Sequence, residues 1–369
     1  MKYYSLDGIL RKNADYNIVF GERSNGKTYA ALKHCIEQFY NNGGEFAYIR
    51  RWKEDILGKR AANIFAALES NDDISELTNG EYTRVKYYNG VFYLANWDEN
   101  TQKLVADSRP CGYTFALSDS EHNKSVSYPN VTNVVFDEFL TRRYYLVDEF
   151  VTFMNVLSTI IRQRDNVKIF MLGNTVNKYC PYFAEMGLRH VKDMKQGSID
   201  VYKYGKSGLT VAVEYAGASS EKGKRRGKKS DKYFAFDNKN LEMITQGKWE
   251  LALYPHLPER YKRSQVLFTY FIDFQGDLLQ CEIVQTDNGL FTYVHEKTTP
   301  LQDPKNDIVF SDRHEIGANY YRRLLHPRDE LSKKIGMFYA TEKVFFQNND
   351  CGEIVRNYIR TTETSQFAS

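Results

Sequence analysis

Four residues near the amino terminus have the types and the spacing that phosphate binding requires. The stretch FGERSNGKTYA, residues 20–30, matches the pattern G-x-x-x-x-G-K-[ST] through Gly21, Gly26, Lys27 and Thr28. Glycines allow backbone N–H groups to close around phosphate oxygens, and the amino end of a following helix adds positive partial charge. We expect Lys27 to reach the β- and γ-phosphates of ATP and Thr28 to hold Mg²⁺. A fortuitous glycine turn is the alternative, but the strand and helix expected on either side of the motif argue against it.

A pair of acids at the end of another apolar segment could supply the chemistry of hydrolysis. In TNVVFDEF, residues 132–139, a core strand delivers Asp137 to its carboxyl end, where open α/β sheets bind ligands. Asp137 fits the Mg²⁺-associated acid of the Walker B pattern, and Glu138 is placed to polarise a water for attack on the γ-phosphate. A solvated acidic turn is the alternative interpretation.

Asn174 ends a further apolar segment, VKIFMLGNT, at residues 167–175. A polar side chain at this point can sense the γ-phosphate or orient the attacking water, and a simple turn-forming asparagine is the alternative. With the phosphate loop and the two acids, this residue predicts an ATPase whose catalytic acid lies on an additional strand, as in ring-forming motors.

Two pairs of arginines end expected elements. Arg50 and Arg51 close a strand, and Arg162 and Arg164 close the helix expected at 148–164. Cations at the carboxyl end of a helix are common because they complement its dipole. The functional interpretation is an arginine finger directed into a neighbouring subunit's site, which contributes about 10³ to 10⁵ in rate. Ring assembly would then switch hydrolysis on.

The segments that must position these residues alternate between strand and helix. Strands are expected at 16–20, 45–51, 132–139 and 167–175, a hairpin at 85–96, and helices from residue 27 and at 148–164. This alternation predicts a mostly parallel sheet with helices on both faces, the fold of a P-loop NTPase of the additional-strand (ASCE) class.

The second half of the chain has a different pattern. A meander of strands is expected at 265–296 and a helix at 349–360, which predicts a smaller C-terminal α+β domain. We expect an ATPase domain at 1–216, a basic linker or lid at 217–260, and the C-terminal domain at 261–369.

Bulk composition leaves these hypotheses open and excludes others. The 369 residues suit about two domains, and the net charge of +3 is too small to indicate nucleic-acid binding by itself. Five widely spaced cysteines predict free thiols rather than a disulfide framework or a zinc site. No signal peptide or apolar run of membrane-spanning length is present, so we expect a cytosolic protein without a membrane partner.

Positive charge is concentrated in one small, polar segment. Seven cations lie within eleven positions: Lys222, Lys224, Arg225, Arg226, Lys228, Lys229 and Lys232. Such a run can neutralise phosphates without regard to sequence, and a solvated linker is the alternative. The partner would be DNA or a structural RNA, which the sequence does not separate. The loop 120–127, which carries Lys124, is a second candidate for nucleic-acid contact.

Four ordered blocks resemble the DNA-packaging ATPases of φ29-type tailed phages, relatives of the terminase large-subunit motors. They are VFGERSNGKTYA, GGEFAYIRRWK, KSVSYPNVTNVVFDEFL and STIIRQRDNVKIFMLGNTVNKYCPYF, and they cover most of residues 15–185. The C-terminal part is similar more weakly, in VLFTYFIDF and VRNYIR. The combination of YPNV, a strand ending in FDEF, and GNTVN…PYF is specific, because a generic P-loop protein does not carry it.

The resemblance implies roles for five basic residues. Arg23 looks like the arginine within the phosphate loop of terminase-type motors, and Arg162 matches the family's trans-acting finger. Arg50 matches the arginine that restrains the catalytic glutamate until DNA or a neighbour engages. Lys53 and Lys124 match basic positions near the channel or the adjacent subunit's nucleotide.

The resemblance also implies an assembly. The family's members form a homopentameric ring on the portal vertex of an empty procapsid and thread double-stranded DNA through its centre. We therefore expect the chain in the cytoplasm of an infected bacterium, transiently at the portal and absent from the mature virion. The C-terminal domain would be a degenerate RNase H-like domain that docks on the capsid side, in some members through a scaffold RNA.

Three other functions compete with this interpretation. A terminase with a live nuclease would use Asp273, in YFIDFQGD, as a first metal-binding acid, but such a site needs several convergent carboxylates. A helicase or other ring translocase would prefer single strands, whereas a packaging motor would be stimulated by duplex. A nucleotide-gated structural adaptor would bind ATP without turnover, and Glu138 argues against that.

Overall fold

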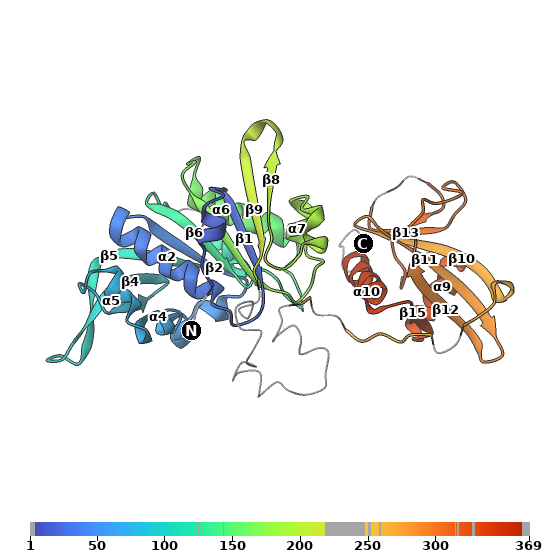
Figure 1. The fold of residues 1–369 in the computed structure, drawn as a ribbon, viewed down its shortest axis with the longest axis horizontal. Coiled ribbons are helices and arrows are strands. Elements are labelled where there is room, and N and C mark those ends of the chain that lie inside the picture. The colour runs from blue at the N-terminus through green and yellow to red at the C-terminus, as the bar shows by residue number, and fades with distance from the viewer. Residues whose placement is uncertain are drawn as a thin grey trace. The chain divides into compact units, whose positions relative to one another are not determined.

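The computed structural model describes residues 4–123, 126–142, 144–217, 248–249, 252–257, 260–313, 315, 317–326 and 329–363. The chain divides into two compact units, residues 1–250 and 251–369, and each contains its own sheet (Figure 1). Most of the expected linker at 217–260 lies outside the described residues, so the division into three parts stays a prediction. Trp249 stacks on Phe20, with ring centroids 5.0 Å apart, so the chain returns to the first unit's core after residue 217.

A nine-stranded sheet forms the first unit, in the order β3-β4-β5-β2-β6-β7-β1-β9-β8. Its strands are β1 (Tyr16–Gly21), β2 (Glu45–Arg50), β3 (Arg84–Tyr88), β4 (Val91–Asp98), β5 (Lys103–Ala116), β6 (Val131–Asp137), β7 (Lys168–Asn174), β8 (Ile199–Tyr204) and β9 (Leu209–Tyr215). The six strands from β5 to β9 in this order are parallel, and antiparallel partners lie at both edges. This arrangement confirms the mostly parallel sheet. Strand β7 separates β1 from β6 and is the additional strand of the ASCE class. It ends in Asn174, whereas the predicted catalytic acid Glu138 directly follows β6, so the expectation that this acid lies on the additional strand is wrong.

Helices cover both faces of this sheet, as expected (Figure 1). Elements α1 (Asp7–Leu10), α2 (Lys27–Asn42), α4 (Ala66–Ser70) and α5 (Asp73–Leu77) bury apolar side chains against one face, and α3 (Gly58–Ala62) follows η1 (Lys53–Ile56) on the way to them. Elements α6 (Glu149–Ile161), α7 (Pro181–Glu185) and η3 (Arg189–Asp193) pack against the other. The short segments η2 (Leu117–Asn123) and η4 (Gly205–Ser207) lie in connections.

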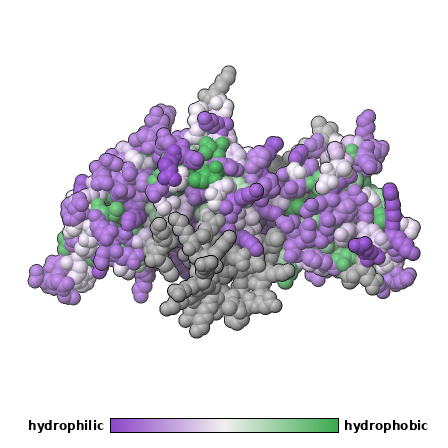
Figure 2. Space-filling model, viewed as in Figure 1, coloured by the Kyte–Doolittle hydropathy of each residue, from purple (hydrophilic) through white to green (hydrophobic). Residues whose placement is uncertain are grey.

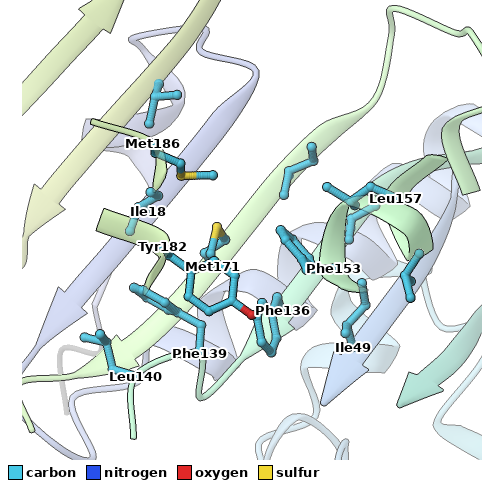
Figure 3. Close-up of a cluster of buried hydrophobic side chains, with 14 of the residues drawn as sticks. Ile18, Ile49, Phe136, Phe139, Leu140, Phe153, Leu157, Met171, Tyr182 and Met186 are labelled. Atoms are coloured by element: carbon cyan, nitrogen blue, oxygen red, sulfur yellow. The ribbon is translucent and has the colours of Figure 1, made fainter. Parts of the chain in front are cut away.

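Aromatic side chains fill the core beneath α6 (Figure 3). Tyr182 is fully buried, and its ring lies 5.8 Å from that of Phe139 and 5.7 Å from that of Phe153, between centroids. Phe136 of β6 and Met171 of β7 complete this group from the sheet. Because buried aromatics interlock with little free space, α6 and α7 are held firmly on the two strands that end at the expected site.

The long strand β5 (Lys103–Ala116) was not predicted from the sequence. Strand β5 begins at Lys103 and pairs with β4 from Lys103 to Tyr113, but it pairs with β2 only from Gly112 onward. Its first part, KLVADSRP, contains polar residues and a proline because only its last residues enter the parallel sheet.

The second unit contains a six-stranded sheet in the order β14-β13-β10-β11-β12-β15. Its elements are η7 (Arg263–Gln265), β10 (Val266–Phe274), β11 (Asp277–Thr286), β12 (Gly289–Glu296), β13 (Val309–Ser311), β14 (Tyr320–Tyr321), α9 (Glu330–Ala340), β15 (Val344–Phe346) and α10 (Asn349–Glu363). Strands β10, β11 and β12 are the expected antiparallel meander, and α10 is the expected closing helix. The smaller C-terminal α+β unit is confirmed.

The visible surface of both units is mostly hydrophilic, with isolated hydrophobic patches (Figure 2). Within the described part of the chain, no helix has the length and apolar character needed to cross a bilayer. All five cysteines are buried and unpaired, as their spacing predicted.

Candidate active site

The phosphate loop connects β1 to α2 at the carboxyl edge of the sheet. Gly26 precedes the helix with a φ of 95°, a left-handed conformation that favours glycine. A Cβ atom at Gly21 would lie 3.2 Å from the Cβ atom of Ala216, so a side chain there would crowd the residue that follows β9. The N–H groups at the start of this 16-residue helix provide the positive end of a dipole for an anion. Arg23 is exposed on the same loop.

Lys27 lies buried inside the loop and is held by three oxygen acceptors. Its Nζ donates to the carbonyl of Glu22 at 2.7 Å, to Oδ1 of Asn25 at 3.1 Å and to Oδ1 of Asn174 at 3.3 Å. Burial lowers the pKa of Lys27 to about 8, although the charges of Asp137 and Glu22 oppose this shift. A buried cation surrounded mainly by neutral acceptors fits an anionic phosphate, whose charge would compensate the loss of hydration.

Thr28 and Asp137 meet at the sheet edge in the way that a nucleotide-bound Mg²⁺ requires. Thr28 Oγ1 donates to Asp137 Oδ1 at 3.0 Å, and Tyr48 donates its hydroxyl proton to Asp137 Oδ2 at 2.8 Å. A hydroxyl and a carboxylate are hard oxygen ligands, so this donor set fits Mg²⁺. Burial raises the pKa of Tyr48 well above its usual value, so the phenol stays a donor to the carboxylate.

Glu138 follows Asp137 in a left-handed backbone conformation, with a φ of 58°. Its side chain is 56% exposed, and Oε2 accepts a 2.7 Å hydrogen bond from Arg50. The same guanidinium lies 3.5 Å from Asp137 Oδ2 and 3.3 Å from Asp55 Oδ2. Burial alone would lower the pKa of Arg50, but the surrounding Tyr48 and carboxylates raise it above its usual value. Arg50 therefore holds the predicted catalytic carboxylate beside the predicted metal ligand.

Asn174 ends β7 beside the first glycine of the loop, since Gly21 and Asn174 are paired in register. Its side-chain oxygen contacts the site by accepting the hydrogen bond from Lys27 Nζ described above. The structure thus brings together Lys27, Thr28, Asp137, Glu138, Arg50 and Asn174, which lie at the ends of three parallel strands, β2, β6 and β7, and at the start of α2.

Arg162 lies at the other end of the first unit's sheet. It follows α6, which runs back from the carboxyl edge of the sheet, and its guanidinium donates to the carbonyl of Val126 at 2.9 Å. Because α6 has 13 residues, about 20 Å separates Arg162 from the carboxyl edge, where the helix begins. The exposed Arg162 therefore cannot serve the site of its own chain.

The other expected basic residues are distributed as follows. Lys53 forms a 2.7 Å ion pair with Asp119 and is 49% exposed. The Arg164 guanidinium donates hydrogen bonds to four backbone carbonyls, those of Ile161, Val131, Tyr128 and Ile160. Lys124 and the basic run from 222 to 232 lie outside the described residues.

Sequence reasoning missed two residues of the site, Tyr48 and Asp55. Tyr48 and Arg50 lie two positions apart on β2, and alternate residues of a strand share a face. That spacing was a usable signal for Tyr48. Asp55 lies in η1, where nothing in the local pattern indicates contact with Arg50.

The second unit lacks, among its described residues, the cluster of metal-binding carboxylates that a nuclease would need around Asp273. Asp273 on β10 lies 3.9 Å from the guanidinium of Arg313, and the described residues contain no group of three potential metal-binding side chains around it. Burial raises the pKa of Asp273, and Arg313 opposes that shift. A cation provided by the chain thus lies where a two-metal site would need carboxylates.

The open parallel sheet, its additional strand and the loop with its facing acids define a P-loop protein of the ASCE class. The model of the family "Podovirus DNA encapsidation protein (Gp16)" matches residues 1–360, and the chain belongs to this family.

Curated relatives are described as DNA packaging proteins. That of Bacillus phage B103 is 33% identical over 175 residues, which cover 47% of this chain and 48% of the relative. That of Bacillus phage phi29 is 30% identical over 189 residues, covering 50% of each chain. The chain therefore spans about half the length of the curated relatives it matches.

The fold is similar to that of a chain in the bacteriophage Phi-29 viral genome packaging motor assembly. The TM-score is 0.56 at 20% sequence identity, over 98% of this chain and 99% of that one. A chain of the Phi-28 gp11 DNA packaging motor is similar with a TM-score of 0.54 at 19% identity, over 100% and 99% of the two chains.

Proposed function

We propose that this chain hydrolyses ATP with Mg²⁺ and uses the energy to move double-stranded viral DNA into a preformed capsid. The observation that carries the proposal is the Thr28–Asp137 contact at 3.0 Å, which joins the phosphate loop to the acidic strand. Membership of the encapsidation family supports DNA as the cargo.

The proposed chemistry assigns one task to each side chain at the catalytic edge. Gly21, Gly26 and the start of α2 bind phosphate oxygens through backbone N–H groups. Lys27 neutralises charge on the β- and γ-phosphates. Mg²⁺, held by Thr28 and Asp137, supplies charge stabilisation when bound. Glu138 orients a water and accepts its proton as the water attacks the γ-phosphate.

Three further side chains would control this reaction. Asn174 contacts Lys27 and can report whether the γ-phosphate is present. Arg50 holds Glu138 at 2.7 Å, and release of this contact would free the carboxylate for the water. Arg23, exposed on the loop, would approach the phosphates from the solvent side.

Arg162 would act on the next subunit. Its position across the sheet from its own site supports a trans-acting finger, because only a neighbouring chain can receive it. A homo-oligomeric ring, which we propose to be a pentamer, would bring each Arg162 to an adjacent γ-phosphate. Lys53 and Lys124 would line the channel or the same subunit boundary.

The proposed partners are duplex DNA, the portal of the procapsid and, in one variant, a scaffold RNA. The basic run Lys222, Lys224, Arg225, Arg226, Lys228 and Lys229 would contact nucleic-acid phosphates. The protein would act in the cytoplasm of the infected bacterium, transiently at the portal vertex, and would be absent from the mature virion.

Protection of DNA from nuclease digestion tests the whole proposal. Purified protein, procapsids, linear duplex and ATP should yield protected DNA, and Lys27→Ala should yield none. Protection that survives Lys27→Ala, or its absence with wild-type protein on intact procapsids, would refute the proposed function.

A further inference from the structure

A buried ion pair lies next to the turn formed by Glu138 and Phe139, called the catalytic turn below, and has no role in the chemistry described above. Arg51 and Glu149 have side chains that are 6% and 0% exposed. Arg51 Nε donates to Glu149 Oε2 at 2.7 Å, and its NH2 nitrogen donates to Oε1 at 2.8 Å. This is the two-pronged geometry that fixes both groups in orientation as well as in distance.

Both carboxylate oxygens of Glu149 accept hydrogen bonds from several donors. Besides Arg51, Oε1 accepts the hydroxyl proton of Tyr182 at 2.7 Å, and Oε2 accepts the backbone N–H of Leu146 at 2.7 Å. The ring of Tyr145 lies under the Arg51 guanidinium, 5.0 Å from its central carbon. The carboxylate thus joins α7, the loop before α6 and the first residue of α6 at one point.

The other side of Arg51 reaches the turn that carries the catalytic carboxylate. Its NH1 donates to the carbonyl of Glu138 at 3.2 Å, and its NH2 donates to that of Phe139 at 2.7 Å. Burial alone would lower the pKa of Arg51, but the hydrogen bonds and charge of Glu149 raise it, so the guanidinium stays charged. The turn to which these bonds attach the guanidinium contains Glu138 in a left-handed conformation, with a φ of 58°.

A purely stabilising role explains this arrangement poorly. A buried ion pair is often no more stabilising than apolar side chains of the same volume, because both charges lose their hydration. Here the pair lies next to the aromatic core around Tyr182, where apolar side chains would pack readily (Figure 3). What apolar side chains could not do is donate to two successive carbonyls of the catalytic turn.

We propose that Arg51 and Glu149 are positioning residues that set the orientation of Glu138 and couple it to α6, the helix that Arg162 directly follows. This inference rests on the proposed hydrolysis. Through Arg51 and Glu149, the turn that carries Glu138 is bonded to the first residue of α6.

The first test separates positioning from folding. Glu149→Gln, Arg51→Lys and the milder Tyr182→Phe are compared with wild type by single-turnover hydrolysis, ATP affinity and thermal unfolding. Misplacement of a catalytic group costs about 100-fold, so we expect kcat to fall about 10- to 100-fold while the Kd for ATP stays within about twofold. Tyr182→Phe removes a single hydroxyl and should give a smaller fall in the same direction.

Glu353→Gln is the matched control. Glu353 is a buried carboxylate of α10 that accepts bonds from Tyr254 and Arg356 in the second unit. The Glu353→Gln substitution should lower the unfolding temperature without lowering the single-turnover rate. Folded Glu149→Gln, Arg51→Lys and Tyr182→Phe proteins that all turn over at the wild-type rate would overturn the proposal.

The second test asks whether Arg51 acts through Glu138. In a Glu138→Gln background, Arg51→Lys should cause no further loss of single-turnover rate, because the group it positions is already gone. Losses that multiply would show that Arg51 acts independently and would refute the inference. If instead Glu138→Gln and Lys27→Ala both keep full activity, the proposed function fails and not only this extension of it.

Discussion

Replacement of Arg162 by alanine should abolish hydrolysis in a way that only a second chain can repair. The finger is expected to contribute about 10³ to 10⁵ in rate, which corresponds to about 4 to 7 kcal/mol of transition-state stabilisation. Its loss should hardly affect folding, because the side chain is exposed and makes one hydrogen bond, to the carbonyl of Val126. Such a bond contributes about 0.5 to 1.5 kcal/mol. Inactivity of a folded Arg162→Ala protein would therefore report catalysis.

The decisive assay mixes two inactive proteins. Lys27→Ala subunits have an intact finger and a defective site, and Arg162→Ala subunits have the reverse. In randomly assembled rings from equal amounts, about one interface in four joins an intact site to an intact finger, so about a quarter of wild-type hydrolysis should return. The double variant Lys27→Ala with Arg162→Ala is the matched donor without a finger and should restore nothing. Absence of rescue at every mixing ratio, under conditions where wild type is active, would refute the trans-acting assignment.

Three further predictions follow from single contacts. Burial lowers the pKa of Lys27 to about 8 and a bound triphosphate should raise it, so the free protein must take up a proton on binding ATP above that pH. We expect the Kd for ATP to be constant below pH 8 and to rise by up to about tenfold per pH unit above it, as measured by titration with a fluorescent analogue. Arg50→Ala removes an ion pair whose Glu138 side chain is 56% exposed, so the pair is worth about 1 kcal/mol. Basal hydrolysis should therefore rise up to about fivefold, and stimulation by DNA should disappear, in a phosphate-release assay. Gly112→Ala would overlap the Phe46 ring and should lower the free energy of unfolding by about 1 to 3 kcal/mol in urea titrations.

Each of these three predictions has a control variant in the same protein. Lys27→Arg, whose side chain stays charged, should lose the dependence on pH, and a flat profile for wild type up to pH 9.5 would contradict the lysine's assignment. Arg60→Ala also removes a contact with Asp55, at 3.3 Å, but none with Glu138, and should leave basal hydrolysis unchanged. Gly8→Ala meets only an ordinary contact and should not destabilise the fold, whereas equal stability of Gly112→Ala would contradict the packing argument.

The catalytic edge was predictable from the sequence because parallel strands bring their carboxyl ends together. Once the loop after Phe20 and the acids after Phe136 were placed on such strands, their proximity followed from topology. The 3.0 Å contact of Thr28 with Asp137 is the result. The apolar run before each motif carried this information, since strands buried on both faces are almost continuously apolar.

Neighbouring arginines could not be told apart in the same way. Arg50 and Arg51 are consecutive, and consecutive side chains at a strand end point to opposite faces. One reaches the catalytic carboxylates and the other the buried Glu149, which lies 98 residues away in the chain. Local sequence does not encode which face will be exposed. Arg164 donates to backbone carbonyls at the end of α6 and Arg162 is exposed, and the local sequence does not encode this difference either.

The most direct test of the account is release of phosphate from ATP by wild type and by Glu138→Gln, measured with ATP affinity in the same preparations. We predict that wild type with duplex DNA releases phosphate and that Glu138→Gln binds ATP with a Kd within about twofold of wild type yet releases almost none. Phosphate release that is unchanged by Glu138→Gln, or absent from wild type even on assembled procapsids, would contradict the claim that this edge of the sheet hydrolyses ATP.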